Sequence, residues 1–306
     1  MVKIAVVGSI NNDITVKVPH LPERGETIPG SQILFCPGGK GANQAVAAAR
    51  YGADVSMVGR VGDDPYGIQL KNGLKNDGID VSYLEIDPEL PTGTALITVD
   101  DSGMNTIVVY RGSNDGLTPE HVEAAKNLLA ESDLIVLQME IPVETIEYTL
   151  KLSREIGVGV ILNTAPAGQI NKDAFACAKV IVANEVEACE LTGIRVSDKS
   201  SAFKACEAFI NMGPEIAIVT MGAEGAVGVN QESQHFVSAY KIDAVDSTAA
   251  GDAFVGVLAA SLAEGITLSD AMRLGAAAGG LAASRMGAQA SMATREEILK
   301  LCQDRR

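Results

Sequence analysis

The feature of this sequence that most restricts its fold is a regular alternation of short apolar runs with segments of helical periodicity. The apolar runs, which predict buried strands, cover residues 2–8, 134–138, 158–163, 180–184 and 216–220. The helical segments cover residues 41–51, 119–131, 143–156, 199–212, 252–264 and 268–284. Strands that alternate with helices predict an α/β fold with a doubly wound, mostly parallel central sheet and helices on both faces. Such a sheet binds its ligands at the carboxyl ends of the strands.

A second kind of strand occurs in two other stretches of the chain. Residues 14–18 alternate apolar and polar side chains, and so do 94–99 and 106–110, which flank a turn of Asp, Ser and Gly and therefore predict a hairpin. We expect a small separate β-sheet, open on one face, formed by residues 13–36 and 91–112. The rest of the chain, 1–12, 37–90 and 113–306, is expected to form the α/β domain.

The charge balance of the 306 residues limits the class of partner. The chain has 24 Lys and Arg against 39 Asp and Glu, a formal net charge of −15. Bulk electrostatics therefore argues against nucleic acid or an anionic membrane as a partner. A small phosphate ligand would need backbone amides and a metal ion instead of a basic surface.

The cysteines and histidines narrow the chemistry further. Five scattered cysteines form neither a disulfide framework nor a zinc motif, and no signal peptide or membrane span is recognised, which predicts a cytoplasmic location. The three histidines are far apart and have ordinary neighbours. The motifs H-E-x-x-H, G-x-S-x-G, G-x-G-x-x-G and Walker A are all missing, so the opening strand gives little support to a nicotinamide oxidoreductase.

The segment Asp246–Phe254, DSTAAGDAF, has the strongest chemical character. The backbone amides of Ala249, Ala250 and Gly251 are expected to point outward at the beginning of a helix, where an anion binds well. Asp252 would lie in the first helical turn, well placed to take a proton from an attacking hydroxyl. The alternative is that Asp252 only caps the helix.

Two further glycine- and amide-rich segments suit a polyol. CPGGKGANQ, residues 36–44, exposes backbone before an Ala-rich helix, and GSINND, residues 8–13, ends the first strand with amide and carboxylate groups that accept hydroxyls. The plain alternatives are a glycine turn and an Asx turn.

Three more loops follow predicted strands or helices. In NEVE, residues 184–187, oxygen atoms could hold magnesium directly or through water, or the same residues could simply begin a helix. TMGAEGAVG, residues 220–228, could wrap a nucleotide or connect two strands. MGAQAS, residues 286–291, offers backbone carbonyls.

Taken together, these segments resemble the ribokinase branch of the PfkB carbohydrate kinase family. The resemblance extends over essentially the whole chain: GSINND resembles the opening sugar-binding motif, GGKGANQAVAAAR the first family signature and DSTAAGDAF the second. Ser247 stands where the family usually has Thr, and it keeps the hydroxyl. The resemblance implies transfer of a phosphoryl group from ATP to the 5-hydroxyl of D-ribose, and it implies a lid-like small sheet through which two copies form a homodimer.

The resemblance also implies a role for each matching position. Asp252 is the general base, and Ala249, Ala250 and Gly251 form the anion hole. The remaining positions are expected to contact sugar (Asn11, Asp13, Gly39, Lys40, Asn43, Glu140), to place magnesium and phosphate (Asn184, Glu187), to bind the nucleotide (Thr220, Gly222, Gly225) and to hold potassium (Asp246, Thr248, Ala282, Arg285, Gly287, Ser291). ATP, magnesium and potassium are the expected cofactors.

Two other functions stay open on the sequence alone. A kinase of another small sugar, such as 2-deoxyribose, would carry the same motifs and differ only in the groups that read the 2-hydroxyl. A non-catalytic sugar or nucleotide sensor would share the fold, although such a protein is expected to have lost the base, and Asp252 is present.

Overall fold

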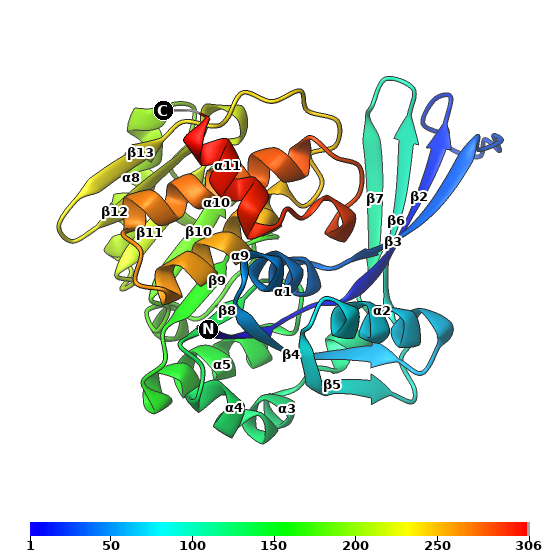
Figure 1. Cartoon of the computed structure of the whole chain (residues 1–306). Coiled ribbons are helices and arrows are strands. Elements are labelled where there is room, and N and C mark those ends of the chain that lie inside the picture. Colours follow the sequence, from blue (N-terminus) through cyan, green and yellow to red (C-terminus); the bar gives the residue numbers. More distant parts are fainter. Residues whose placement is uncertain (305–306) are drawn as a thin grey trace.

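The computed structural model describes residues 1–304 and contains two separate β-sheets (Figure 1). The larger sheet has nine strands in the order β13-β12-β11-β10-β9-β8-β1-β4-β5. Its strands, in chain order, are β1 Lys3–Val7, β4 Asp54–Gly62, β5 Asp80–Asp87, β8 Leu134–Leu137, β9 Val160–Asn163, β10 Val180–Asn184, β11 Ile216–Thr220, β12 Ala226–Asn230 and β13 Gln234–Val237. The seven strands from β11 to β5 in this spatial order are parallel to one another. Strands β12 and β13 continue the sheet beyond β11 and pair antiparallel. The predicted fold class is confirmed.

Helices cover both faces of the large sheet (Figure 1). On one face lie α1 Lys40–Tyr51, α2 Pro65–Asn76, α9 Ala250–Ala263, α10 Leu268–Ala283 and α11 Arg295–Gln303. On the other lie α3 Pro119–Ala124, α4 Lys126–Ala130, α5 Val143–Ile156, α6 Lys172–Phe175, α7 Glu185–Thr192 and α8 Lys199–Ile210. Short 3₁₀ turns occupy Gly112–Gly116, Gly222–Glu224 and Gln289–Ser291. Along β1 the buried side chains alternate: Ile4 and Val6 enter the core under the first group, and Ala5 and Val7 enter the core under the second.

The small sheet has four strands in the order β3-β2-β6-β7 and stands beside the main body (Figure 1). These strands are β2 Asn11–Val18, β3 Gln32–Gly38, β6 Gly93–Asp100 and β7 Asn105–Tyr110. The predicted hairpin is confirmed: β6 and β7 pair antiparallel, and the Asp100 side chain accepts backbone hydrogen bonds from Ser102 and Met104 in the turn between them. Every residue of β7 is exposed.

One helix and two strands of the fold differ from the sequence-based expectations. The predicted helix 119–131 is divided at Ala125, because its N–H bonds to the carbonyl of Val122, three residues back, in a tighter turn than an α-helix. Strands β4 and β5 were not predicted, because β4 mixes Ser, Arg and Gly with apolar residues and β5 carries charges. Within residues 1–304, no helix has the length and apolar character needed to cross a bilayer.

Candidate active site

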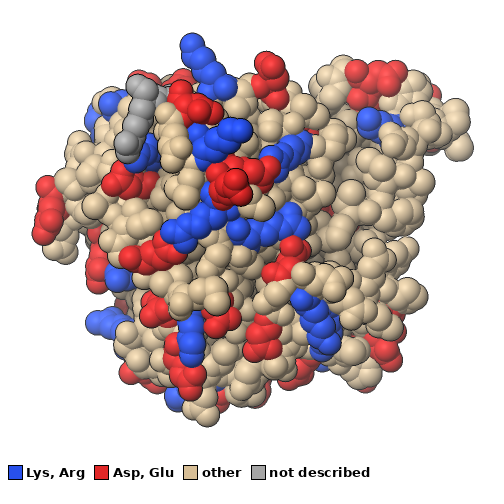
Figure 2. All heavy atoms as spheres, viewed as in Figure 1, with Lys and Arg blue, Asp and Glu red and all other residues tan. Residues whose placement is uncertain are grey.

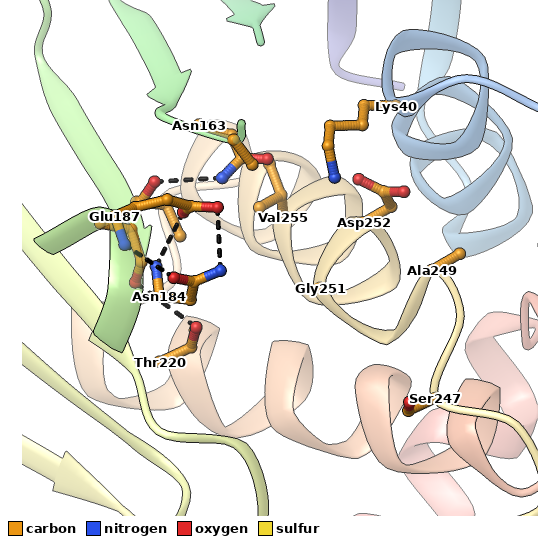
Figure 3. A pocket seen from close by; sticks show the side chains of 13 residues that line it. Lys40, Asn163, Asn184, Glu187, Thr220, Ser247, Ala249, Gly251, Asp252 and Val255 are labelled. Atoms are coloured by element: carbon orange, nitrogen blue, oxygen red, sulfur yellow. Dashed lines mark hydrogen bonds between the residues drawn. The ribbon is translucent and has the colours of Figure 1, made fainter. Parts of the chain in front are cut away.

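A pocket of about 230 Å³ opens at the carboxyl ends of β9, β10 and β11, facing the beginning of α9 (Figure 3). Seven of the predicted site residues line it: Lys40, Asn184, Glu187, Thr220, Ala249, Gly251 and Asp252. This is the place at which an α/β sheet is expected to bind its ligand. Residues more than two hundred positions apart therefore meet in one cavity.

The beginning of α9 is shaped by Ala249, which has φ 60° and ψ 9°. Among residues 1–304 it is the one non-glycine residue with a positive φ, a left-handed conformation that costs roughly 1–2 kcal/mol. This turn brings Ala249 and Gly251 to the pocket wall. The expectation that all three amides point outward is wrong for Ala250, whose N–H turns back to the carbonyl of Ser247 at 3.2 Å.

Asp252 occupies the third position of α9 and is only 5% exposed. Its carboxylate does not cap its own helix. Instead, Oδ2 accepts a hydrogen bond from Asn43 Nδ2 at 2.9 Å, and Oδ1 accepts one from Gln44 Nε2 at 3.0 Å, both from α1. The Lys40 side chain extends toward the same carboxylate (Figure 3), and Asp252 raises the pKa of this lysine. The carboxylate is thus held at the pocket by two amide donors, with the positive charge of Lys40 nearby.

A second group of acidic side chains lies on the small-sheet side of Lys40. Glu140 follows β8 and accepts hydrogen bonds from Ser9 Oγ at 2.6 Å and from the Lys40 N–H at 3.1 Å. Burial first, and then the negative charges of Glu140 and Asp252, raise the pKa of Asp13, on β2, to about 7 against the opposing charge of Lys40. Three carboxylates around one ammonium group make a site rich in acceptors for hydroxyl groups.

Other predicted sugar-contacting residues lie next to this group. Asn11 begins β2, is buried, and accepts a hydrogen bond from Asn114 Nδ2 at 2.8 Å. Gly39, with φ 85°, packs so closely against Asn11 and Ile10 that a Cβ at this position would lie 2.7 Å from the Asn11 nitrogen. Of the predicted sugar set, Asn43 contacts Asp252 directly, and electrostatic interaction joins Asp13 and Lys40 to Asp252.

Asn184 and Glu187 form a reciprocal cap at the beginning of α7 on the opposite pocket wall (Figure 3). Asn184 Oδ1 accepts from the Glu187 N–H, while Glu187 accepts from the Asn184 N–H at 2.9 Å and from its Nδ2 at 2.8 Å. Burial raises the pKa of Glu187, against the hydrogen bond from Asn184 and the charge of Lys40. The helix-capping interpretation is therefore correct, and both residues also line the pocket.

The glycine turn after β11 connects it to the antiparallel strand β12. Thr220 lines the pocket, whereas Gly222 and Gly225 lie in the following turn, outside the pocket lining. Gly225 has φ 119°, and a Cβ there would lie 2.0 Å from the Val237 carbonyl oxygen. The backbone of this turn therefore requires glycine for packing.

The predicted potassium-binding residues lie behind the beginning of α9. The Asp246 carboxylate accepts from the Thr248 N–H at 2.9 Å and from the Gly287 N–H at 3.0 Å, and so joins the loop before α9 to the loop after α10. Burial raises the pKa of Asp246, but these hydrogen bonds outweigh it and hold that pKa below its usual range. Ser291 is buried, and its hydroxyl donates to the Ala288 carbonyl.

Two residues of the predicted potassium site, Ala282 and Arg285, already have partners within the protein. The Ala282 carbonyl oxygen accepts the Arg285 N–H at 3.1 Å, and the Arg285 side chain forms an ion pair with Glu297. A set of one carboxylate and several backbone oxygens suits a hard monovalent cation. In residues 1–304, no three His, Cys, Asp or Glu side chains gather as a metal cluster.

Several residues of the site were not identified from the sequence. Gln44, Gln138 and Asn163 form a buried chain of amides that ends on Asp252, and Asn114 orients Asn11. The available signal was a glutamine placed within an Ala-rich helix at a position that proves to be fully buried.

Comparisons with known proteins agree with this geometry. A family model described as "pfkB family carbohydrate kinase" matches residues 1–295. A ribokinase of Haemophilus influenzae is 37% identical over 297 residues, which are 97% of both chains, and a deoxyribokinase of Salmonella typhi is 36% identical over 257 residues, 84% of both. The structure of Arabidopsis thaliana ribokinase complexed with ribose and ATP is similar with a TM-score of 0.91 and 30% identity, covering 98% of this chain and 99% of that one. The resemblance inferred from the motifs is confirmed: this chain belongs to the pfkB family of carbohydrate kinases.

Proposed function

We propose that this protein transfers the γ-phosphoryl group of ATP to the 5-hydroxyl of D-ribose and so produces D-ribose 5-phosphate and ADP. The observation that carries the proposal is the position of the Asp252 carboxylate. It lies between the pocket lined by Asn184, Glu187 and Thr220 and the acidic group around Lys40. An alcohol on one side and a phosphate on the other would meet at this carboxylate. The ribokinases among the relatives and the ribose and ATP in the Arabidopsis structure support the same assignment.

Asp252 acts as the general base in this proposal. It takes the proton of the 5-hydroxyl as the sugar oxygen forms a bond to the γ-phosphorus, and the bond from that phosphorus to the β–γ bridging oxygen breaks. The amides of Ala249 and Gly251 stabilise the charge on the transferred group, with help from the dipole of α9. Ala250 contributes less, because its N–H is used within the turn.

The sugar binds among Asn11, Asp13, Gly39, Lys40, Asn43 and Glu140. Asn43 gives the clearest support: its Nδ2 donates to Asp252, while its buried Oδ1 has no hydrogen-bond partner in residues 1–304. A buried amide oxygen without a partner is costly, and a sugar hydroxyl would satisfy it. Carboxylates such as Asp13 accept from two hydroxyls at once.

The nucleotide occupies the other end of the pocket, near Thr220 and the turn that contains Gly222 and Gly225. Magnesium would bind beside Glu187 through water. Each carboxylate oxygen of Glu187 already accepts a hydrogen bond from Asn184, and its remaining lone pair can accept one from a water molecule on the ion. When bound, magnesium neutralises charge on the phosphates. Lys40 adds a fixed positive charge between the sugar and the phosphate.

Potassium would bind at Asp246 with backbone oxygens of Thr248, Ala282, Arg285 and Gly287 and with Ser291. Support comes from the Asp246 carboxylate, which joins the two loops on either side of this site. A cation there would fix the turn at Ala249 from behind by its effect on geometry.

The small sheet, residues 13–36 and 91–112, serves as a lid over the sugar and as the surface of a homodimer. Its exposed apolar side chains support this: Val108 is 65% exposed, and Leu96 and Tyr110, on the same face of the sheet, are exposed beside it. On the face shown in Figure 2, charged side chains spread over the main body, whereas the small sheet carries few. An apolar face of this kind is usually covered by a partner. The five free cysteines fit a reducing, cytoplasmic location.

The test of the proposed function is Asp252→Asn, assayed with ATP and ribose. Turnover should fall by about 10²- to 10⁴-fold, with ribose binding, measured by calorimetry, changed little. Asp270→Asn is a matched control, because Asp270 occupies the same third position in the neighbouring helix α10, where its side chain is half exposed. Undiminished turnover in Asp252→Asn would remove Asp252 as the base.

The sugar itself is tested by an acceptor scan with the unmodified protein. Ribose should be phosphorylated with a higher kcat/KM than 2-deoxyribose, fructose or adenosine. A preference for 2-deoxyribose would favour the activity named for the Salmonella relative instead.

A further inference from the structure

Gln44 lies on α1 directly behind the Asp252 carboxylate. It is fully buried, and three of the four hydrogen-bonding positions of its amide are occupied: Nε2 donates to Asp252 Oδ1 and to Asn163 Oδ1, both at 3.0 Å, and Oε1 accepts from Gln138 Nε2 at 2.8 Å. Both donors of the amide are used within the protein, and the side chain is buried outside the pocket lining, so it is not placed to contact a substrate. Any effect of Gln44 on the reaction must therefore act through its hydrogen bond to Asp252.

The orientation of the Gln44 amide is determined by a backbone group two steps away. The Val182 carbonyl can only accept, so Asn163 must present Nδ2 to it, at 3.1 Å. The Oδ1 of Asn163 then faces Gln44 and can only accept, so Gln44 must donate to it from Nε2. The second hydrogen on Nε2 is thereby directed at Asp252. The alternative orientation would place the Gln44 oxygen against two other oxygen atoms.

The packing of α1 against α9 makes this short contact available. Gly256 lies one turn after Asp252, and a Cβ on it would lie 2.5 Å from the Gln44 carbonyl oxygen and 2.7 Å from the Ala47 Cβ. A larger residue would separate the two helices and lengthen the hydrogen bond from Gln44 to Asp252. The contact therefore depends on a glycine in the helix that carries the base.

We propose that Gln44 is a positioning residue for the general base: with Asn163 and Gln138 behind it, its amide holds the Asp252 carboxylate in one orientation, so that a free lone pair faces the attacking hydroxyl. This inference rests on the proposed function. Asn43 holds the other carboxylate oxygen, but its free Oδ1 makes it a sugar contact as well. Gln44 is the contact whose removal tests orientation without removing a sugar ligand.

The first test is Gln44→Met, which keeps the length of the side chain and removes its donors. We expect kcat to fall by about tenfold to a hundredfold, since small displacements of a reacting group are costly, with the KM for ribose unchanged within about threefold. Thr145→Val is the matched control. Thr145 is fully buried and donates to the Leu117 carbonyl at 2.7 Å, on the opposite face of the sheet. Its loss should lower the melting temperature and leave kcat unchanged.

The second test is Gln44→Glu. Glutamate has nearly the same shape as glutamine, so this variant should fold even if Gln44→Met does not. Two adjacent carboxyl groups share a proton, so the acid limb of the kcat/KM profile should move to higher pH by about one unit or more. The other charged groups that interact with Asp252 are Lys40, Asp13 and Glu187, and Glu140 lies beside Lys40 and Asp13; both proteins keep all four.

The outcomes separate the two proposals. An unchanged kcat in Gln44→Met, or an unmoved acid limb in Gln44→Glu, overturns the positioning role if Asp252→Asn is inactive. Full turnover in Asp252→Asn overturns the proposed base itself, and the positioning role falls with it.

Discussion

Replacing Asp13 by Asn should make the protein more stable at alkaline pH. Burial, then the charges of Glu140 and Asp252, raise the pKa of this carboxyl from 3.8 to about 7 in the folded chain. Between these two values the folded state holds a proton that the unfolded state has released, so folding stability falls as pH rises through this window. The neutral amide of the Asp13→Asn variant carries no such penalty.

The size of the effect follows from the pKa difference. At about 1.36 kcal/mol per pKa unit, the stability of Asp13→Asn relative to the parent should increase by about 3 kcal/mol between pH 4.5 and pH 8.5. The chain has no tryptophan, so urea unfolding is best followed by circular dichroism at both pH values. Asp54→Asn, at the exposed beginning of β4, is the control and should show no comparable change.

The reasoning would be refuted by a stability difference that is the same at both pH values, or by a variant that is relatively less stable at pH 8.5. The same change should weaken ribose binding at pH 8, because a carboxylate that accepts from two hydroxyls is lost. A gain in stability together with a loss of sugar binding is the usual pattern for a charged group held in a binding site.

Two further predictions concern the beginning of α9. Ala249→Gly relieves the left-handed strain at φ 60° but makes the unfolded chain more flexible, so the free energy of unfolding should change by less than about 1 kcal/mol while kcat falls. The control Ala276→Gly, inside α10, should lower the free energy of unfolding by about 1 kcal/mol. Equal decreases in the free energy of unfolding of the two variants, measured in urea, would contradict this account of Ala249. Replacing potassium by sodium should lower kcat, potassium should restore it, and Asp246→Asn should remove the response; equal rates in both salts would leave Asp246 without the proposed role.

The amino-acid sequence by itself determined the class of fold and several of the segments that meet at the candidate site. Its apolar runs and helical periods are local patterns, and they predicted the strands β1, β8, β9, β10 and β11 and the helices α1, α5, α8, α9 and α10. DSTAAGDAF also placed Asp252 in the first turn of α9, because small residues followed by an apolar helix indicate that turn locally. These features depend on near neighbours in the chain, so pattern suffices to find them.

Only the tertiary structure decided which partners the polar side chains have. Gln44 and Asp252 are 208 positions apart, and nothing local shows that α1 and α9 pack closely enough for their side chains to bond. Whether Asp13 carries a charge at neutral pH depends on burial and on carboxylates from other elements. The Ala250 amide is used within the turn that contains the left-handed Ala249, and the sequence did not show this. Contacts between distant segments set hydrogen bonds and charge states, and those are the properties on which this chemistry depends.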